Sequence, residues 1–230
     1  FRAHRVCRFV LSESGAGYVS RQQEEVIKTR HSAFRPIDAK IGPDGALYIA
    51  DWYNPIIQHG EVDFRDERRD HTHGRIWRVT FKGRSLAERP QIVGAPIEAL
   101  FEMLRAPEEH TRLNAKLELK SRGNTALDKL GPWVNALDSA DPRFDHLRLE
   151  GLWTYQTLDV VEPQLLAALL RSPDHHVRAA ATRVLSAWHA RVPQADALLA
   201  VQVEDEHPQV RLEAVRALAA LGTAQAAELA

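Results

Sequence analysis

The sequence predicts a mixed architecture, with an all-β segment over residues 1–88 and an all-α solenoid over residues 89–230. Most of the 12 glycines precede residue 95, where short runs of β-favouring residues alternate with turn residues. Beyond that point, Ala-, Leu- and Arg-rich segments return at spacings of 30–36 residues. Glycine-punctuated strands followed by recurring helical segments indicate two regions built by different rules.

Composition excludes several classes of protein. The 230 residues carry a formal net charge of -1 and no basic stripe with interleaved aromatic residues, which argues against nucleic-acid binding. The sequence holds no run of 18 apolar residues, so no transmembrane helix is predicted. Cys7 stands alone, which leaves no internal disulfide and no Cys-x-x-Cys-His site for covalent haem. The chain opens on Phe1 without a signal-peptide pattern, as expected for a piece of a larger protein.

The first region contains several strand signals. Residues 6–12 alternate before a Gly-Ala-Gly turn at residues 15–17, and residues 25–29 form another short β-favouring run. Gly42-Pro-Asp-Gly45 predicts a hairpin turn, because Pro43 presets φ and Gly45 tolerates a positive φ. Residues 74–80 restart the strand alternation after a long polar segment. Short strands of this kind fit the sheets of a propeller or a sandwich.

The second region repeats a helical pattern. Arg178 and Arg211 each begin an Arg-x-x-Ala frame, and weaker copies begin at Arg112 and Arg148. In the last two copies the apolar positions superimpose at i, i+4, i+7, i+8 and i+11, which is one face of an α-helix. A second helical segment is predicted upstream of each copy, at residues 97–105, 133–137, 163–171 and 195–203. About four helix pairs are therefore expected, stacked as an α-solenoid.

Two resemblances follow from these motifs. Ser-Pro-Asp-His-His-Val-Arg178 and Asp-Glu-His-Pro-Gln-Val-Arg211 resemble HEAT-like repeats. Phe34-Arg-Pro-Ile-Asp38, residues 42–55 and Arg69-Asp-His-Thr-His-Gly-Arg-Ile-Trp-Arg78 resemble the end of the β-propeller in membrane-bound dehydrogenases of planctomycete-type bacteria. These proteins are relatives of the glucose/sorbosone dehydrogenases.

The second resemblance implies a fragment of a multidomain redox protein, with one or two blades of a quinone-dependent sugar dehydrogenase and a HEAT-like spacer or docking region. It implies pyrroloquinoline quinone (PQQ) and calcium as cofactors of the intact protein, a c-type cytochrome module as a partner, and a periplasmic or otherwise extracytoplasmic location. Because most of the propeller is missing, the fragment alone is expected to be inactive. The alternative is a non-catalytic propeller and HEAT scaffold that binds a protein or a polysaccharide.

The polar segment between residues 51 and 75 is the candidate site, because long loops in compact domains are often functional. His59, Asp70 and His73 are the candidate catalytic residues, with a histidine relaying protons and Asp70 orienting it or neutralising Arg75. Arg75 and Asp51 are the candidate cofactor-binding residues, since a guanidinium fork suits carboxylates. No metal-ligand set is assigned. The alternative is that these are solvated loop charges that pair with one another.

Other residues have a structural and a functional interpretation. Asp44 fits a turn better than a calcium site. Trp52, Tyr53 and Trp77 fit packing between strands better than stacking on a planar cofactor. The resemblance to HEAT-like repeats implies that Arg178 and Arg211 form an internal ladder, each bonded to an acid or a carbonyl of the neighbouring repeat, rather than bind a partner. His175 and His176 are expected at the surface, because adjacent helix residues do not face one another.

Overall fold

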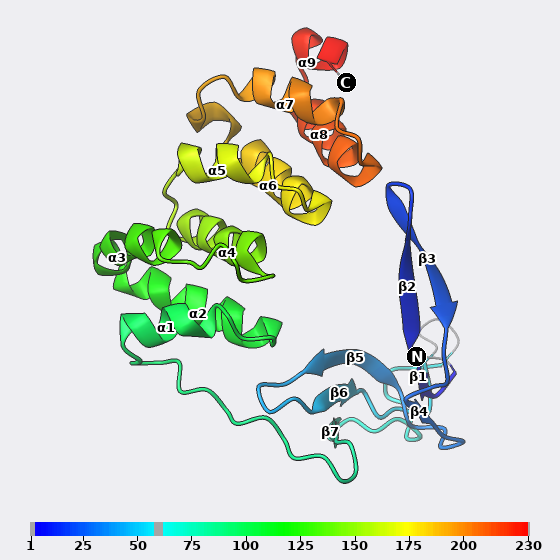
Figure 1. Cartoon of the computed structure of the whole chain (residues 1–230). Coiled ribbons are helices and arrows are strands. Elements are labelled where there is room, and N and C mark those ends of the chain that lie inside the picture. The colour runs from blue at the N-terminus through cyan, green and yellow to red at the C-terminus, as the bar shows by residue number, and fades with distance from the viewer. Residues whose placement is uncertain (1–2, 58–61, 230) are drawn as a thin grey trace. The chain divides into compact units, whose positions relative to one another are not determined.

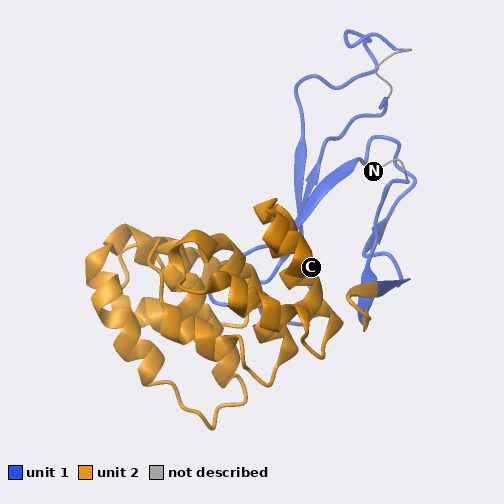
Figure 2. Ribbon diagram, turned by 90° about the horizontal axis from the view of Figure 1, so that it is seen from above, with its two compact units in different colours: residues 1–12, 19–90 blue, residues 13–18, 91–230 orange. Residues whose placement is uncertain are grey.

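The computed structural model describes residues 3–57 and 62–229. The chain divides into two compact units, coloured separately in Figure 2. The first comprises residues 1–12 and 19–90, and the second comprises residues 13–18 and 91–230.

Short strands dominate the first unit. Within the described residues they are β1 (Arg5–Val6), β2 (Phe9–Ser14), β3 (Gly17–Gln22), β4 (Ile27–Lys28), β5 (Pro36–Ile41), β6 (Leu47–Asp51) and β7 (Arg75–Val79). β1 pairs with β4, β2 with β3, and β5, β6 and β7 form an antiparallel sheet in that order (Figure 1). The predicted hairpin is confirmed, since Ile41 pairs with Leu47 and Gly45 has a φ of +75°.

The prediction of small β-structure in this region is confirmed, but a propeller blade is not seen in the described residues. A blade has four strands, whereas the sheets here have two, two and three. The segment between β6 and β7 supplies no further strand in its described part. There, Asp63, Asp66 and Asp70 each accept a hydrogen bond from the backbone N–H of the residue two positions later, which folds the segment into turns.

The second unit is helical. Its helices are α1 (Ile97–Met103), α2 (Glu109–Arg122), α3 (Asn124–Asn135), α4 (Phe144–Thr157), α5 (Pro163–Leu169), α6 (His175–Trp188), α7 (Ala195–Val203), α8 (Pro208–Leu221) and α9 (Ala224–Leu229), with a 3₁₀ turn at His189–Arg191. Figure 1 shows successive pairs stacked along the unit, and α2, α4, α6 and α8 each contact the next of this series. Every helix among the described residues is too short or too polar to cross a lipid bilayer.

One helix differs from its prediction. The sequence predicted a short helix at residues 133–137, whereas α3 begins at Asn124 and ends at Asn135. Gly131 and Pro132 both disfavour a helix interior, yet both lie inside this helix. Burial of Ala126 and Leu130 against the core outweighs that local penalty.

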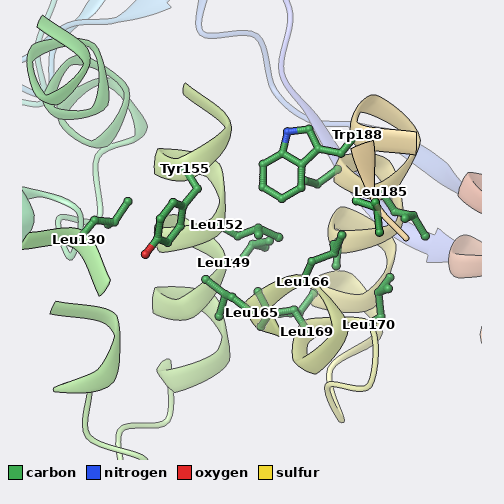
Figure 3. Close-up of a cluster of buried hydrophobic side chains, with 14 of the residues drawn as sticks. Leu130, Leu149, Leu152, Tyr155, Leu165, Leu166, Leu169, Leu170, Leu185 and Trp188 are labelled. Atoms are coloured by element: carbon green, nitrogen blue, oxygen red, sulfur yellow. The ribbon is translucent and has the colours of Figure 1, made fainter. Parts of the chain in front are cut away.

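A continuous apolar core joins the helix pairs. Leu152 of α4, Leu166 and Leu169 of α5, and Leu185 and Trp188 of α6 are at most 1% exposed and lie in one cluster (Figure 3). The helix faces predicted from the repeat are confirmed, because the corresponding residues of α6 and α8 are buried apart from Leu221, which packs against the cluster. No helix pair buries its apolar face alone, as a solenoid requires.

Candidate functional site

Asp51, the last residue of β6, ties three segments of the first unit together. Its Oδ1 accepts hydrogen bonds from the backbone N–H groups of Arg35 (2.7 Å) and Tyr53 (2.9 Å), and its Oδ2 accepts one from Nε1 of Trp77 (2.9 Å). The residue is 3% exposed and pairs with Arg75 across β6 and β7. Because Oδ1 accepts two hydrogen bonds and Oδ2 accepts one, Asp51 fixes the positions of these three segments.

Tyr53 carries the local backbone strain. Its φ is +51°, in the left-handed region that costs a bulky residue energy, and the hydrogen bond to Asp51 helps to hold it there. The guanidinium of Arg75 lies 3.5 Å from the centroid of the Tyr53 ring and 5.6 Å from that of Trp77. His31 stacks with the same tyrosine, with ring centroids 5.8 Å apart.

These side chains line a pocket of about 330 Å³. Its lining is formed by Ile27, Thr29, His31, Phe34, Asp51, Tyr53, Arg75 and Trp77. The walls are largely apolar and aromatic, and one guanidinium is present at an aromatic face. Such a pocket suits a flat ring that carries negative charge, because stacking and a guanidinium pair act on the same ligand.

The structure separates the predicted site residues into groups. Asp51 and Arg75 line the pocket together, whereas Asp70 and His73 form a turn outside its lining. His73 Nδ1 lies 3.0 Å from Asp70 Oδ2, and the histidine side chain is 72% exposed. The pKa of Asp70 falls to about 2, because the backbone N–H of Thr72 and then the N–H and ring of His73 outweigh the opposing effect of burial. His59 lies outside the described residues.

Two buried arginines organise the polar segment, and the sequence analysis missed both. Arg69 donates to the carbonyls of Asp63 (2.9 Å) and Val62 (3.0 Å), and Arg35 donates to those of Asn54 (3.0 Å) and Pro55 (2.9 Å). Each is 6% exposed. A cluster of charges in the sequence gives no sign of which arginine turns inward to bind backbone carbonyls.

The repeat arginines of the second unit share one arrangement. Arg178 donates to the carbonyl of Ser172 (2.8 Å), six residues earlier, and Nε reaches Asp205 of the next repeat (2.8 Å). Arg211 donates to the carbonyl of Asp205 (2.7 Å), also six residues earlier. Arg112 does the same at Ala106 (2.8 Å). The predicted internal ladder is confirmed for Arg178, whereas the contacts of Arg211 are made within its own repeat.

A groove of about 540 Å³ lies among α3, α4 and α5. Its lining is formed by Gly131, Val134, Asn135, Leu137, Phe144, Arg148, Tyr155, Glu162, Gln164 and Leu165. Phe144 and Tyr155 are eleven residues apart on α4, so the lining extends over about 16 Å of that helix. Burial, with the charge of Glu162, raises the pKa of Tyr155.

Comparison with known proteins identifies two segments of the chain. Residues 3–83 match a domain of unknown function (DUF7133), and residues 161–230 match HEAT repeats. No curated protein and no solved structure gives a significant match. The HEAT-like character predicted from the last two repeats is therefore confirmed, while neither family match names a dehydrogenase.

Proposed function

We propose that residues 91–230 form a docking scaffold, in which the groove along α4 receives an extended segment of a partner protein. The observation that carries this proposal is the groove itself, set in an array that matches HEAT repeats over residues 161–230. Solenoids of stacked helix pairs commonly use their extended surfaces for protein binding.

The chemistry of the groove favours a peptide backbone. The side-chain amides of Asn135 and Gln164 make no hydrogen bonds within the described residues, and each can both donate and accept. The half-buried side chains of Val134 and Phe144 add apolar contacts to the lining. At about 3.3 Å per residue, the 16 Å groove accommodates roughly five residues of extended chain.

Peptide selection tests this proposal. A random peptide library displayed on phage is selected against the full chain, and the enriched peptides are measured with Asn135→Ala and with Arg148→Glu. We expect each variant to weaken peptide binding about tenfold or more. Loss of one good polar contact costs about 1.4 kcal/mol of binding free energy, which corresponds to a tenfold change in Kd. Arg191→Ala, an exposed change outside the groove, is the matched control. Peptides that bind all variants equally, or a library without enrichment, would contradict the groove assignment.

A second candidate is favoured by the pocket of the first unit. We propose that this unit belongs to a larger redox protein resembling quinone-dependent sugar dehydrogenases, in an extracytoplasmic compartment and with a cytochrome module as electron acceptor. The guanidinium of Arg75, placed against the rings of Tyr53 and Trp77, fits a planar, polycarboxylated quinone such as PQQ. The carboxylate of Asp51 already accepts three hydrogen bonds, so a calcium ion in the intact protein would need most of its roughly six to eight oxygen ligands from outside this pocket.

The intact protein provides the test of this candidate. It is reconstituted with calcium and PQQ, and dye reduction by sugars is followed for wild type, Arg75→Ala and His73→Ala. Loss of activity in Arg75→Ala with intact folding would support the pocket as the quinone site. Unchanged activity in both variants would show that neither Arg75 nor His73 belongs to the quinone site. An intact protein that binds no quinone would contradict the redox proposal and leave the docking scaffold as the proposed function.

A further inference from the structure

Three histidine rings meet where two successive repeats begin their second helices. His175 is the first residue of α6, and His207 is the N-cap of α8. Their ring centroids are 3.5 Å apart, and the ring of His176 lies 3.9 Å from that of His175. The prediction that both histidines lie at the surface is confirmed for His176, which is exposed, whereas His175 is half-buried. The two rings also lie close together, although adjacent helix residues were not expected to face one another.

Carboxylates complete the cluster. Oδ1 of Asp174 lies 2.9 Å from Nδ1 of His176, and Asp174, His175 and His176 each offer a ligand atom within 4.8 Å of the others. Residues 13–18 cluster with this unit, and Glu13 adds a carboxylate 3.4 Å from Nε2 of His175. That nitrogen is buried and makes no hydrogen bond within the described residues.

We propose that His175, His176, His207 and Asp174 bind a divalent transition-metal ion of the zinc type. Neutral imidazole nitrogens and carboxylate oxygens are the ligands that such ions prefer, and four of them make a tetrahedral site. Asp174, His175 and His176 offer ligand atoms within 4.8 Å of one another, and His207 offers one within 4.8 Å of His175, in a second group that Glu13 completes. Rotation of the His207 ring, which stacks on His175, would bring its free nitrogen to the first group. His207 uses Nδ1 to accept the N–H of Gln209 (3.3 Å), which leaves Nε2 for the ion.

The ion would join two repeats. His175 and His176 start α6, whereas His207 starts α8, so one ion held by these residues links the beginnings of both helices. The link adds to the ion pair of Arg178 with Asp205, which connects the same two repeats. This site uses residues outside both the α4 groove and the Arg75 pocket, so it stands independently of the proposed functions.

Zinc titration tests the site. The full chain, without a histidine tag and dialysed against chelator, is titrated with ZnCl₂ by calorimetry, and the titration is repeated for His175→Gln and His207→Asn. Asparagine preserves the N-cap of α8 while removing the imidazole, so this variant separates capping from metal binding. His189→Gln is the control, because His189 belongs to the same array but pairs with Asp196 (2.7 Å).

We expect one zinc ion per chain and at least about a tenfold loss of affinity in both ligand variants, with the control unchanged. Circular dichroism without metal establishes whether each variant is folded. If His207→Asn is unfolded, the result for His175→Gln decides the test. Absence of saturable binding, or equal affinity in wild type and a folded ligand variant, would overturn the proposal. An equal loss in His189→Gln would also overturn it, because binding would then be unspecific.

Discussion

The two units are stabilised in different ways. In the second unit, buried leucine, alanine and tryptophan side chains form a cluster that extends through the helix pairs. In the first, the buried apolar residues are Ala33, Phe34, Ala46 and Ile49, among the residues described. They share the interior with the polar residues Arg35, Asp51, Asn54 and Arg69. The first unit therefore depends on directional hydrogen bonds to the backbone, and the second on apolar burial.

The largest effect is expected from the apolar core. Trp188→Ala removes a side chain that is 1% exposed in the cluster of the second unit, and should cost about 3–5 kcal/mol of unfolding free energy. Urea denaturation followed by the helical circular dichroism signal measures this cost. Leu212→Ala on α8, where the leucine is 40% exposed, should stay within about 0.5 kcal/mol. Similar costs for the two variants would mean that the packing is assigned to the wrong face.

The ion pair of Arg178 with Asp205 tests whether a polar contact also stabilises the second unit. Arg178→Ala breaks a nearly buried ion pair with Asp205 and should cost about 3 kcal/mol. Arg211→Ala removes two hydrogen bonds to carbonyls from an exposed residue of the next repeat, and should cost about 1 kcal/mol. The same denaturation measurement compares the pair. Equal costs would show that the acidic partner adds nothing to the carbonyl contacts.

In the first unit, loss of the Asp51 carboxylate should lower the unfolding free energy nearly as much as loss of Arg178 does in the second unit. Asp51→Asn replaces an acceptor with an amide N–H group, which cannot satisfy all three donors now bonded to the carboxylate. We expect a loss of about 1.5–3 kcal/mol, because the acceptor is charged and buried. The indole N–H resonance of Trp77 should move with it in NMR spectra. Asp38→Asn, an exposed change on β5, is the control. An unmoved Trp77 resonance in Asp51→Asn would contradict the hydrogen bond between the indole and the Asp51 carboxylate.

This difference explains how far sequence reasoning reaches. Apolar periodicity recurs in the second unit, so the faces of α6 and α8 could be predicted from spacing, and the role of Arg178 from the resemblance of these repeats to HEAT-like repeats. The turn at Gly42-Pro-Asp-Gly45 was equally predictable, because its residue types restrict φ locally. The extent of α3 was not, since burial of Ala126 and Leu130 keeps the helix continuous through Gly131 and Pro132.

The candidate site was only partly predictable. Strand ends placed Asp51 and Arg75 near the polar segment, and the β6–β7 register brings them opposite each other. The inward turn of Arg35 and Arg69 depends on carbonyls in irregular backbone, which have no sequence period. The same holds for the positive φ of Tyr53, which the bond to Asp51 helps to hold and which tyrosine does not itself favour.

The smallest expected effect concerns acid, and it follows from the polar character of the first unit. Burial pushes the pKa of Asp44 upward, but the backbone N–H of Ala46 and the side chains of Arg78 and Tyr48 outweigh it and lower this pKa to about 2. An unfolded aspartate titrates near about 3.9, so the native state holds the charged form more tightly. The resulting stabilisation is complete above about pH 4 and is lost as the pH falls through about 2.

The amide resonance of Ala46 reports on this titration, because its N–H donates to Asp44 at 3.1 Å. In wild type we expect its chemical shift to titrate with a midpoint near pH 2, as the pKa of Asp44 falls to about 2. Asp44→Asn should abolish this transition, while Asp38→Asn should leave it in place. A midpoint near pH 4 in wild type would show that the hydrogen bonds to Asp44 do not favour its charged form. The hairpin would then be held by its turn residues and strand pairing alone.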